Sequence, residues 1–178
     1  MATAPTLPIM PLEQYLNSSW RPDMEYVDGV LVERNVGTLP HSRLRRVLLL
    51  HFDRFRSTMR IEALPECRTK VAETRFRIPD VMVVSTPIDE TARVYTGVPL
   101  VVIEILSRDD RQKDVLARFG DYATLGVRHL IQMDPEDRET RVYRGRDLVT
   151  ASVTALDLND GRALPFNSDE LLDQLSRP

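Results

Sequence analysis

The sequence has one cysteine, almost no lysine and no long apolar run. The single cysteine, Cys67, excludes an intramolecular disulfide and a cysteine zinc cluster. No stretch approaches the roughly 20 apolar residues that a membrane-spanning helix needs. Residues 1–11 have neither the basic nor the apolar segment of a secretory signal. These absences predict a cytoplasmic protein that does not enter a membrane.

A large excess of charge of one sign is also missing. The 178 residues carry a formal net charge of −3, whereas a dedicated nucleic-acid coat protein is usually strongly basic. Of the 24 basic residues only Lys70 and Lys113 are lysine, so 22 are arginine, which indicates a coding bias towards arginine. The length suits one domain. We predict a single domain over 1–178, with a loose segment at 1–11 and a core over about 24–158.

What is present is a clear succession of strands and helices. Residues 25–34 form two alternating runs around Asp28-Gly29, a strong hairpin signal. Residues 41–60 and 109–125 carry apolar stripes at helical spacing, the second ending before Gly126. Strands are expected at 68–75, 76–84, 100–106, 129–134, 140–144 and 147–158, and short helices at 12–17 and 169–175. This order predicts an α/β fold, a mixed sheet flanked by helices with an N-terminal β-hairpin.

The helix expected at 41–60 has a strongly basic outer surface. Its apolar stripe must face the core, which leaves six arginines against one acid, Asp53, on the other faces. A solvated basic surface is the simpler interpretation. Contact with a phosphate backbone is the alternative.

Two carboxylates stand beside strongly apolar strands. Glu104 lies inside "PLVVIEILS", a run typical of a strand that is buried on both faces, and Asp80 follows Pro79 where another strand begins. If the two strands are antiparallel and Val84 faces Leu100, paired residue numbers sum to 184, as those of Asp80 and Glu104 do. The two carboxylates would then lie opposite each other on one face of the sheet.

Opposed carboxylates repel each other unless a cation lies between them. Two carboxylates and a backbone carbonyl suit Mg²⁺, for which Mn²⁺ can substitute, and Leu106 is placed to supply that carbonyl. The pattern therefore predicts a metal site made by Asp80, Glu104 and Leu106. In a different register each acid would instead pair with its own arginine.

The order of several short motifs resembles the PD-(D/E)xK nuclease superfamily, and more closely its Uma-type restriction endonuclease family. The matching stretches run from about residue 24 to residue 144 and are "EYVDG", His41 before a helix, "PDVMVV", "PLVVIEILS", Asp114, Arg118 and Tyr122 in the next helix, "GV" and "HLIQMDP". Each stretch alone is a weak signal, but their order and spacing together are fairly specific.

The resemblance implies a restriction-endonuclease-like fold, a divalent metal held by Asp80 and Glu104, and phosphodiester hydrolysis. It also implies roles near the site for Glu25, His41 and Asp114. Simpler interpretations remain open: Glu25 as an exposed charge of the hairpin, and His41 as the cap of a helix.

The chain departs from the superfamily at its lysine. The position two residues after the glutamate is Leu106, and in the Uma-type family the lysine stands in the following helix, where this chain has Arg118. An arginine stays protonated and cannot act as a general base, but it can bind a phosphate in the transition state. The local interpretation is an ordinary helix pair between Asp114 and Arg118. Lys70 and Lys113 are candidate substitutes.

The leading prediction is a Mg²⁺-dependent endonuclease that cleaves DNA, acts as a homodimer and uses Arg118 on the scissile phosphate. The alternative is a catalytically inactive protein of the same fold that binds nucleic acid or a protein partner. A third class, a glycosidase-like hydrolase with paired carboxylates, has little support, because Trp20 is the only tryptophan and no set of sugar-binding aromatic residues is evident.

Overall fold

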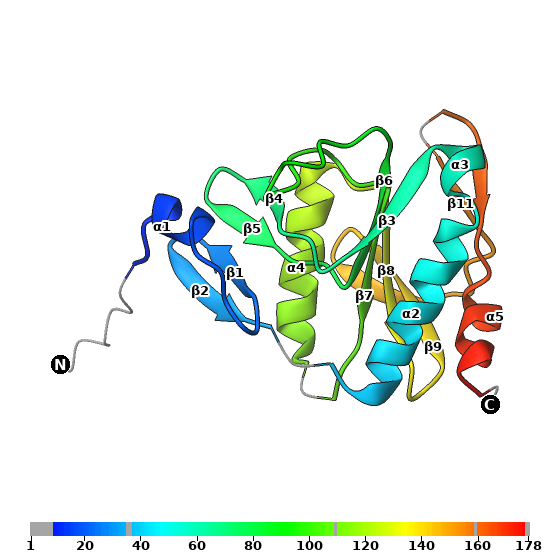
Figure 1. Cartoon of the computed structure of the whole chain (residues 1–178). Coiled ribbons are helices and arrows are strands. Elements are labelled where there is room, and N and C mark those ends of the chain that lie inside the picture. Colours follow the sequence, from blue (N-terminus) through cyan, green and yellow to red (C-terminus); the bar gives the residue numbers. More distant parts are fainter. Residues whose placement is uncertain (1–8, 35–36, 109, 159, 177–178) are drawn as a thin grey trace.

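The computed structural model describes residues 9–34, 37–108, 110–158 and 160–176. Its centre is a six-stranded sheet in the order β10-β9-β8-β7-β6-β3 (Figure 1). β7 and β8 are parallel and the other neighbours are antiparallel. The strands are β3 (Ile61–Pro65), β6 (Val81–Ser85), β7 (Val101–Ile105), β8 (His129–Asp134), β9 (Glu139–Arg144) and β10 (Asp147–Thr150). The sheet is therefore mixed, as expected.

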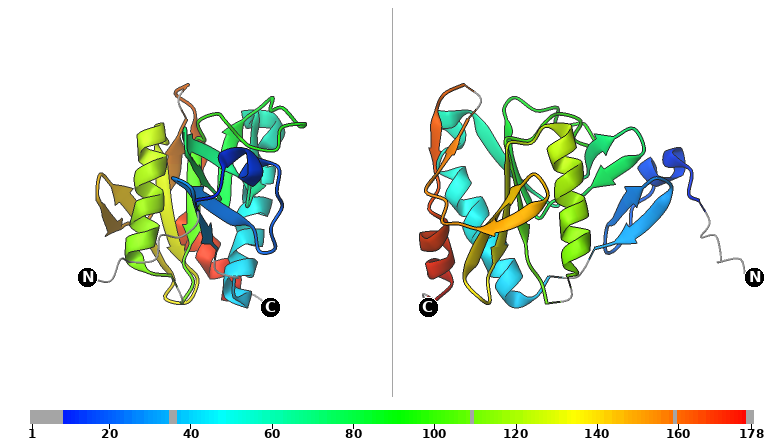
Figure 2. Two further views of the ribbon diagram at one scale, coloured as in Figure 1. Left: turned by 90° about the vertical axis from the view of Figure 1, so that its left-hand side faces the viewer. Right: turned by 180° about the vertical axis from the view of Figure 1, so that it is seen from behind.

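Two long helices cover opposite faces of this sheet (Figure 2). α2 (Leu39–Asp53) packs on the face that carries Val101, Ile103 and Ile105 of β7. α4 (Gln112–Leu125) packs on the face that carries Val102. Because successive residues of a strand point to opposite faces, burial on both sides explains why β7 is apolar almost throughout.

A second, smaller sheet lies beside α4, at the left of Figure 1, and has the order β2-β1-β5-β4. Its strands are β1 (Met24–Val27), β2 (Val30–Glu33), β4 (Thr69–Ala72) and β5 (Arg75–Arg77). β1 and β2 form the expected hairpin, and both turn residues, Asp28 and Gly29, have positive φ, as a two-residue hairpin turn requires. Tyr15 of α1 (Leu12–Leu16) stacks on Tyr26 with ring centroids 5.0 Å apart.

Several element boundaries differ from the prediction. The helix expected at 41–60 is α2 followed by α3 (Arg56–Met59), which ends at Arg60 in a left-handed conformation. The strand expected at 76–84 is divided between β5 and β6, which belong to different sheets, and Pro79 between them has no N–H to donate to a ladder. The strand expected at 147–158 is β10 and β11 (Ala155–Asp157), which pairs with β12 (Ala163–Pro165). β3 and β12 were not predicted.

The core on the α2 face extends past residue 158, where the sequence had placed its end. Phe166 stacks on Phe52 of α2 with ring centroids 5.7 Å apart. α5 (Ser168–Asp173) and the 3-10 turn η1 (Gln174–Ser176) add Leu171, Leu172 and Leu175 to the same cluster. The C-terminal segment therefore completes the apolar layer over the large sheet.

The chain before α1 contacts the hairpin. Met10 N donates to Gly29 O at 2.9 Å, and Tyr26 Oη donates to Met10 O at 2.8 Å. The segment 1–11 was expected to be loose, but Met10 and Pro11 make these and further backbone hydrogen bonds, and residues 1–8 lie outside the described residues. Across the described ranges, every helix is too short or too polar to cross a bilayer.

The stack of Phe166 on Phe52 gives a stability test. Phe166→Ala should lower the free energy of unfolding by about 3–5 kcal/mol, because it removes a fully buried ring and leaves a cavity against α2. Val149→Ala, at an exposed position of β10, should change it by less than about 0.5 kcal/mol. Urea unfolding followed by circular dichroism measures both. Equal effects would show that the C-terminal segment does not belong to the cooperative core.

Candidate active site

Asp80 and Glu104 converge on one face of the large sheet. The pairs Val81↔Ile103, Met82↔Val102 and Val83↔Val101 all sum to 184, so the predicted register is correct. Asp80 stands two residues before Met82 and therefore points to the same face as Met82. Glu104 likewise points to the face of Val102. Met82 and Val102 pack against α4, so both carboxylates lie under that helix. They are 3% and 2% exposed.

The cation between the two carboxylates is Arg34. Its Nη2 donates to Asp80 Oδ1 at 2.6 Å, and its Nη1 donates to Glu104 Oε2 at 3.1 Å. Nη1 also lies 3.7 Å from Glu25 Oε1. Arg34 directly follows β2 and was not among the predicted site residues.

Asp80 is held by donors from three parts of the chain. Besides Arg34, Ile105 N donates to Oδ2 at 2.7 Å, and His41 Nε2 lies 3.3 Å from Oδ1. Burial alone would raise the pKa of Asp80, but the charge of Arg34 and the bonds from His41 and the Ile105 amide outweigh it. The pKa of Asp80 is therefore lowered well below its usual value. The carboxylate is ionised across the physiological range.

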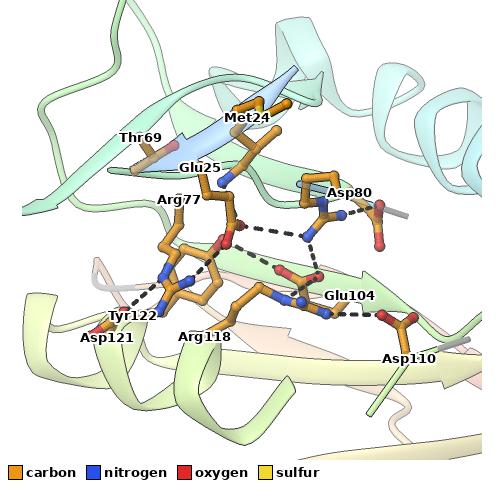
Figure 3. A network of polar contacts seen from close by, with 12 residues as sticks. Met24, Glu25, Thr69, Arg77, Asp80, Glu104, Asp110, Arg118, Asp121 and Tyr122 are labelled. Carbon is orange, nitrogen blue, oxygen red and sulfur yellow. Dashed lines mark hydrogen bonds and ion pairs between the residues drawn. The ribbon is translucent and has the colours of Figure 1, made fainter. Parts of the chain in front are cut away.

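Glu104 has the opposite electrostatic balance. Arg118 Nε lies 3.2 Å from Oε2, and Tyr122 Oη donates to Oε1 at 3.3 Å (Figure 3). Burial raises the pKa of Glu104, and the negative charges of Asp80 and Glu25 add to burial. Together they outweigh Arg118 and Arg34, so the pKa of Glu104 is raised above its usual value. Two neighbouring acids thus differ in how strongly each holds a proton.

Glu25 is buried beside the pair and is not an exposed hairpin charge. Its Oε1 accepts from Ile78 N at 3.1 Å, and its Oε2 accepts from Arg77 Nη1 at 2.7 Å. Arg77 Nε in turn donates to Asp121 Oδ2 at 2.7 Å, so a chain of ion pairs runs from β1 through β5 to α4 (Figure 3). The simpler interpretation of Glu25 is therefore wrong.

His41 lies in the first turn of α2 and is not its cap. The N-cap is Thr38, whose side chain accepts from His41 N. The imidazole is buried, with Nε2 towards Asp80 and Nδ1 3.3 Å from Arg45 Nη2. His41 therefore orients the Asp80 carboxylate from the α2 side.

Arg118 reaches the carboxylate pair, whereas Asp114 does not. Arg118 Nη2 lies 3.6 Å from Asp110 Oδ1. Asp114 is exposed and, within the described part of the chain, makes no ion pair, so the local helix pair with Arg118 is absent. The lysines are not substitutes: Lys70 Nζ pairs with Glu73 at 3.0 Å on the other sheet, and Lys113 is exposed on α4.

A pocket of about 310 Å³ adjoins the pair and is lined by Arg34, His41, Asp80, Asp110, Asp114 and Arg118, among others. No group of three His, Cys, Asp or Glu side chains is arranged to hold a metal ion among the residues described. A divalent ion here would therefore need the two carboxylates together with backbone or water oxygens. These donors fit Mg²⁺, because they are hard oxygens and already surround a cation. Leu106 follows β7 directly, and its role as carbonyl ligand stays a prediction.

The opposite pKa shifts predict different pH dependences in the presence of a chelator. A lowered pKa gives a stabilisation that is complete above the unfolded-state pKa of about 4 and is lost only at lower pH, so the cost of Asp80→Asn should stay constant at about 3–5 kcal/mol between pH 5 and pH 7. A raised pKa stabilises the fold only below the folded-state pKa, so the cost of Glu104→Gln should shrink as the pH rises from 4 to 7. Urea unfolding at three pH values tests this, and parallel curves for the two variants would contradict it.

Comparisons with known proteins agree with this geometry. The family model Uma2, described as "Putative restriction endonuclease", matches residues 12–168. The crystal structure of a putative nuclease belonging to DUF820 from Anabaena variabilis ATCC 29413 has the same fold. Its TM-score is 0.74 at 21% identity, over 89% of this chain and 94% of that chain. No curated protein matches the chain. Because the family model covers most of the sequence, the chain belongs to the Uma2 family, whose description is "Putative restriction endonuclease".

Proposed function

We propose that the protein is a Mg²⁺-dependent endonuclease that hydrolyses phosphodiester bonds in DNA. The observation that carries the proposal is the buried pair of Asp80 and Glu104, opposed in register, surrounding a cation and adjoining a pocket. Membership of a nuclease family supports the same reaction. In this proposal Asp80 and Glu104 hold the ion, with the Leu106 carbonyl as a further ligand. When bound, a divalent ion acts as a Lewis acid on the phosphate and lowers the pKa of water.

Arg118 is suited to bind the scissile phosphate. Its Nε–H is buried and has no hydrogen-bond acceptor among the described residues, although the Glu104 carboxylate lies 3.2 Å away. Arg118 also lines the pocket, so its guanidinium stands next to the space that a phosphate oxygen would enter. Burial would lower the pKa of Arg118, but Glu104 and the other nearby carboxylates raise it, so the guanidinium stays charged. Arg118 therefore offsets charge that develops on the phosphate and takes no proton from water.

His41 and Glu25 act as positioning residues. His41 fixes the Asp80 carboxylate from α2, and Glu25 holds Arg77 and the amide of Ile78 just before Asp80. Asp114 stands at the pocket wall, where it would face the substrate. The exposed arginines on and directly after α2, Arg46 and Arg54 among them, offer a basic surface for a DNA backbone. A homodimer would match the two-fold symmetry of a duplex.

Two observations favour a second candidate, a protein of this fold that binds nucleic acid without cleaving it. Arg34 already occupies the space between the carboxylates, and Arg118 replaces the family lysine. Binding that does not depend on metal, with no cleavage at any metal concentration, would establish this alternative.

The cleavage test uses supercoiled plasmid with Mg²⁺ or Mn²⁺. The wild-type protein should nick or linearise it, and Asp80→Ala should lower the rate at least about 100-fold, because one of two carboxylate ligands is lost. Glu73→Ala, which removes an exposed carboxylate that pairs with Lys70 on the small sheet, is the matched control and should retain activity. Equal rates for wild type and Asp80→Ala would refute the assignment of the site.

Arg118 gives an independent test of the phosphate role. Arg118→Ala should reduce cleavage about 100-fold or more, because an electrostatic contact to the phosphate is lost. Arg118→Lys restores a charged donor and should retain much of the rate. Single-turnover cleavage measured over pH 6–9 compares the variants. A fully active Arg118→Ala would remove this residue from the mechanism.

A further inference from the structure

Arg34 occupies the place that a metal ion needs. The inner oxygens of the pair are Asp80 Oδ1 and Glu104 Oε2, and the two terminal nitrogens of Arg34 contact one each, at 2.6 and 3.1 Å. The outer oxygens are also in use, since Asp80 Oδ2 accepts from Ile105 N and Glu104 Oε1 accepts from Tyr122 Oη. An ion that binds both carboxylates must therefore use the oxygens that Arg34 now contacts.

Arg118 does not block the ion in the same way. It contacts Glu104 Oε2 from α4 and leans towards Asp110 on its other side, and it does not bridge to Asp80 (Figure 3). Arg34 bridges both carboxylates and brings a permanent charge, because nearby Glu104, Asp80 and Glu25 raise its pKa well above the ordinary value despite burial. The guanidinium does not become neutral, so it cannot give up its hold on the carboxylates by losing a proton. An ion can take its place only if the Arg34 side chain moves away.

We propose that Arg34 is an internal competitor for the divalent ion: its guanidinium closes the site when no metal is bound and must withdraw into the adjoining pocket for metal to bind. This inference rests on the proposed function. It assigns to Arg34, a residue outside the family motifs described above, control over the metal affinity of the site.

The surroundings of Arg34 allow this movement. The residue stands directly after β2, an edge strand of the small sheet, and its side chain lines the 310 Å³ pocket. The Arg34 side chain is 15% exposed, whereas those of Asp80 and Glu104 are 4% and 2% exposed. Asp80 stands directly before β6 and Glu104 lies in β7, so the strands hold both carboxylates in place, and the arginine has the most exposed side chain of the three.

Competition of this kind reduces the observed affinity for metal. If the site accepts an ion only while Arg34 is withdrawn, the apparent Kd equals the intrinsic Kd divided by the withdrawn fraction. Removing the guanidinium abolishes the competition. A withdrawn fraction below about one tenth therefore predicts that Arg34→Gln binds metal at least about tenfold more tightly.

The experiment measures Mn²⁺ binding to the metal-free full chain by the electron paramagnetic resonance signal of free Mn²⁺. Arg34→Gln should bind at least about tenfold more tightly than wild type. Arg68→Gln is the matched control: Arg68 has a side chain of similar exposure, 12%, and pairs with Asp23 away from the site, so the variant should bind as wild type does. Adding Asp80→Asn to Arg34→Gln should abolish the gain, which locates the ion at the pair.

The outcomes separate this inference from the proposed function. Equal Mn²⁺ affinity in wild type and Arg34→Gln overturns the competitor role and leaves the metal-dependent nuclease standing. Failure of both to bind Mn²⁺ overturns both proposals. If Arg34→Gln does not fold, Arg34→Met replaces it. The methionine side chain is uncharged and fills similar space, so this variant should also bind Mn²⁺ more tightly than wild type, and an unchanged affinity would again reject the inference.

Discussion

The site depends on one physical constraint, the compensation of buried negative charge. Asp80, Glu104 and Glu25 are almost fully buried, and an uncompensated charge in such a position costs several kcal/mol. Arg34, Arg77 and Arg118 supply the compensation from the end of the hairpin, from β5 and from α4. The small sheet, the large sheet and α4 are thus joined by the charges that make the site, and the removal of any one partner leaves a buried charge uncompensated and weakens the fold.

The alternation of strand residues determines which face of the sheet carries the carboxylate pair. Odd-numbered residues of β7 pack against α2 in a wholly apolar cluster, and even-numbered ones face α4. Asp80, directly before β6, and Glu104, near the end of β7, both lie on the face that α4 covers. At this edge of the sheet the apolar contacts end and the pocket begins. A shift of one residue in β7 would move the Glu104 side chain to the other face, into the apolar layer that packs on α2. The site therefore forms only when β6 and β7 pair in the observed register.

The sequence predicted the parts of the site that depend on local rules. Strand periodicity and the sum of paired residue numbers placed Asp80 opposite Glu104, the Asp28-Gly29 turn placed the hairpin, and Gly126 placed the end of α4. Arg34 could not be found in this way. Its partners Asp80 and Glu104 are 46 and 70 residues away in the sequence. Arg34 is also one of 22 arginines in the chain, and the sequence places it at the end of a strand that looks exposed. The one available signal was the need for a cation between opposed carboxylates, which also fits a metal ion.

Because its cations are arginines, this site keeps its positive charge, which a site with lysine need not do. A buried lysine can lose its proton, so it can become neutral when a metal ion binds beside it. Arg34 and Arg118 both keep their charges, because the surrounding carboxylates raise their pKa values against the effect of burial. Under the proposed function, a divalent ion that enters the site would therefore meet fixed positive charge on the side of the pair that borders the pocket. The balance between metal-free and metal-bound forms would then depend on the position of the Arg34 guanidinium, and the surrounding acids would determine how firmly it is held.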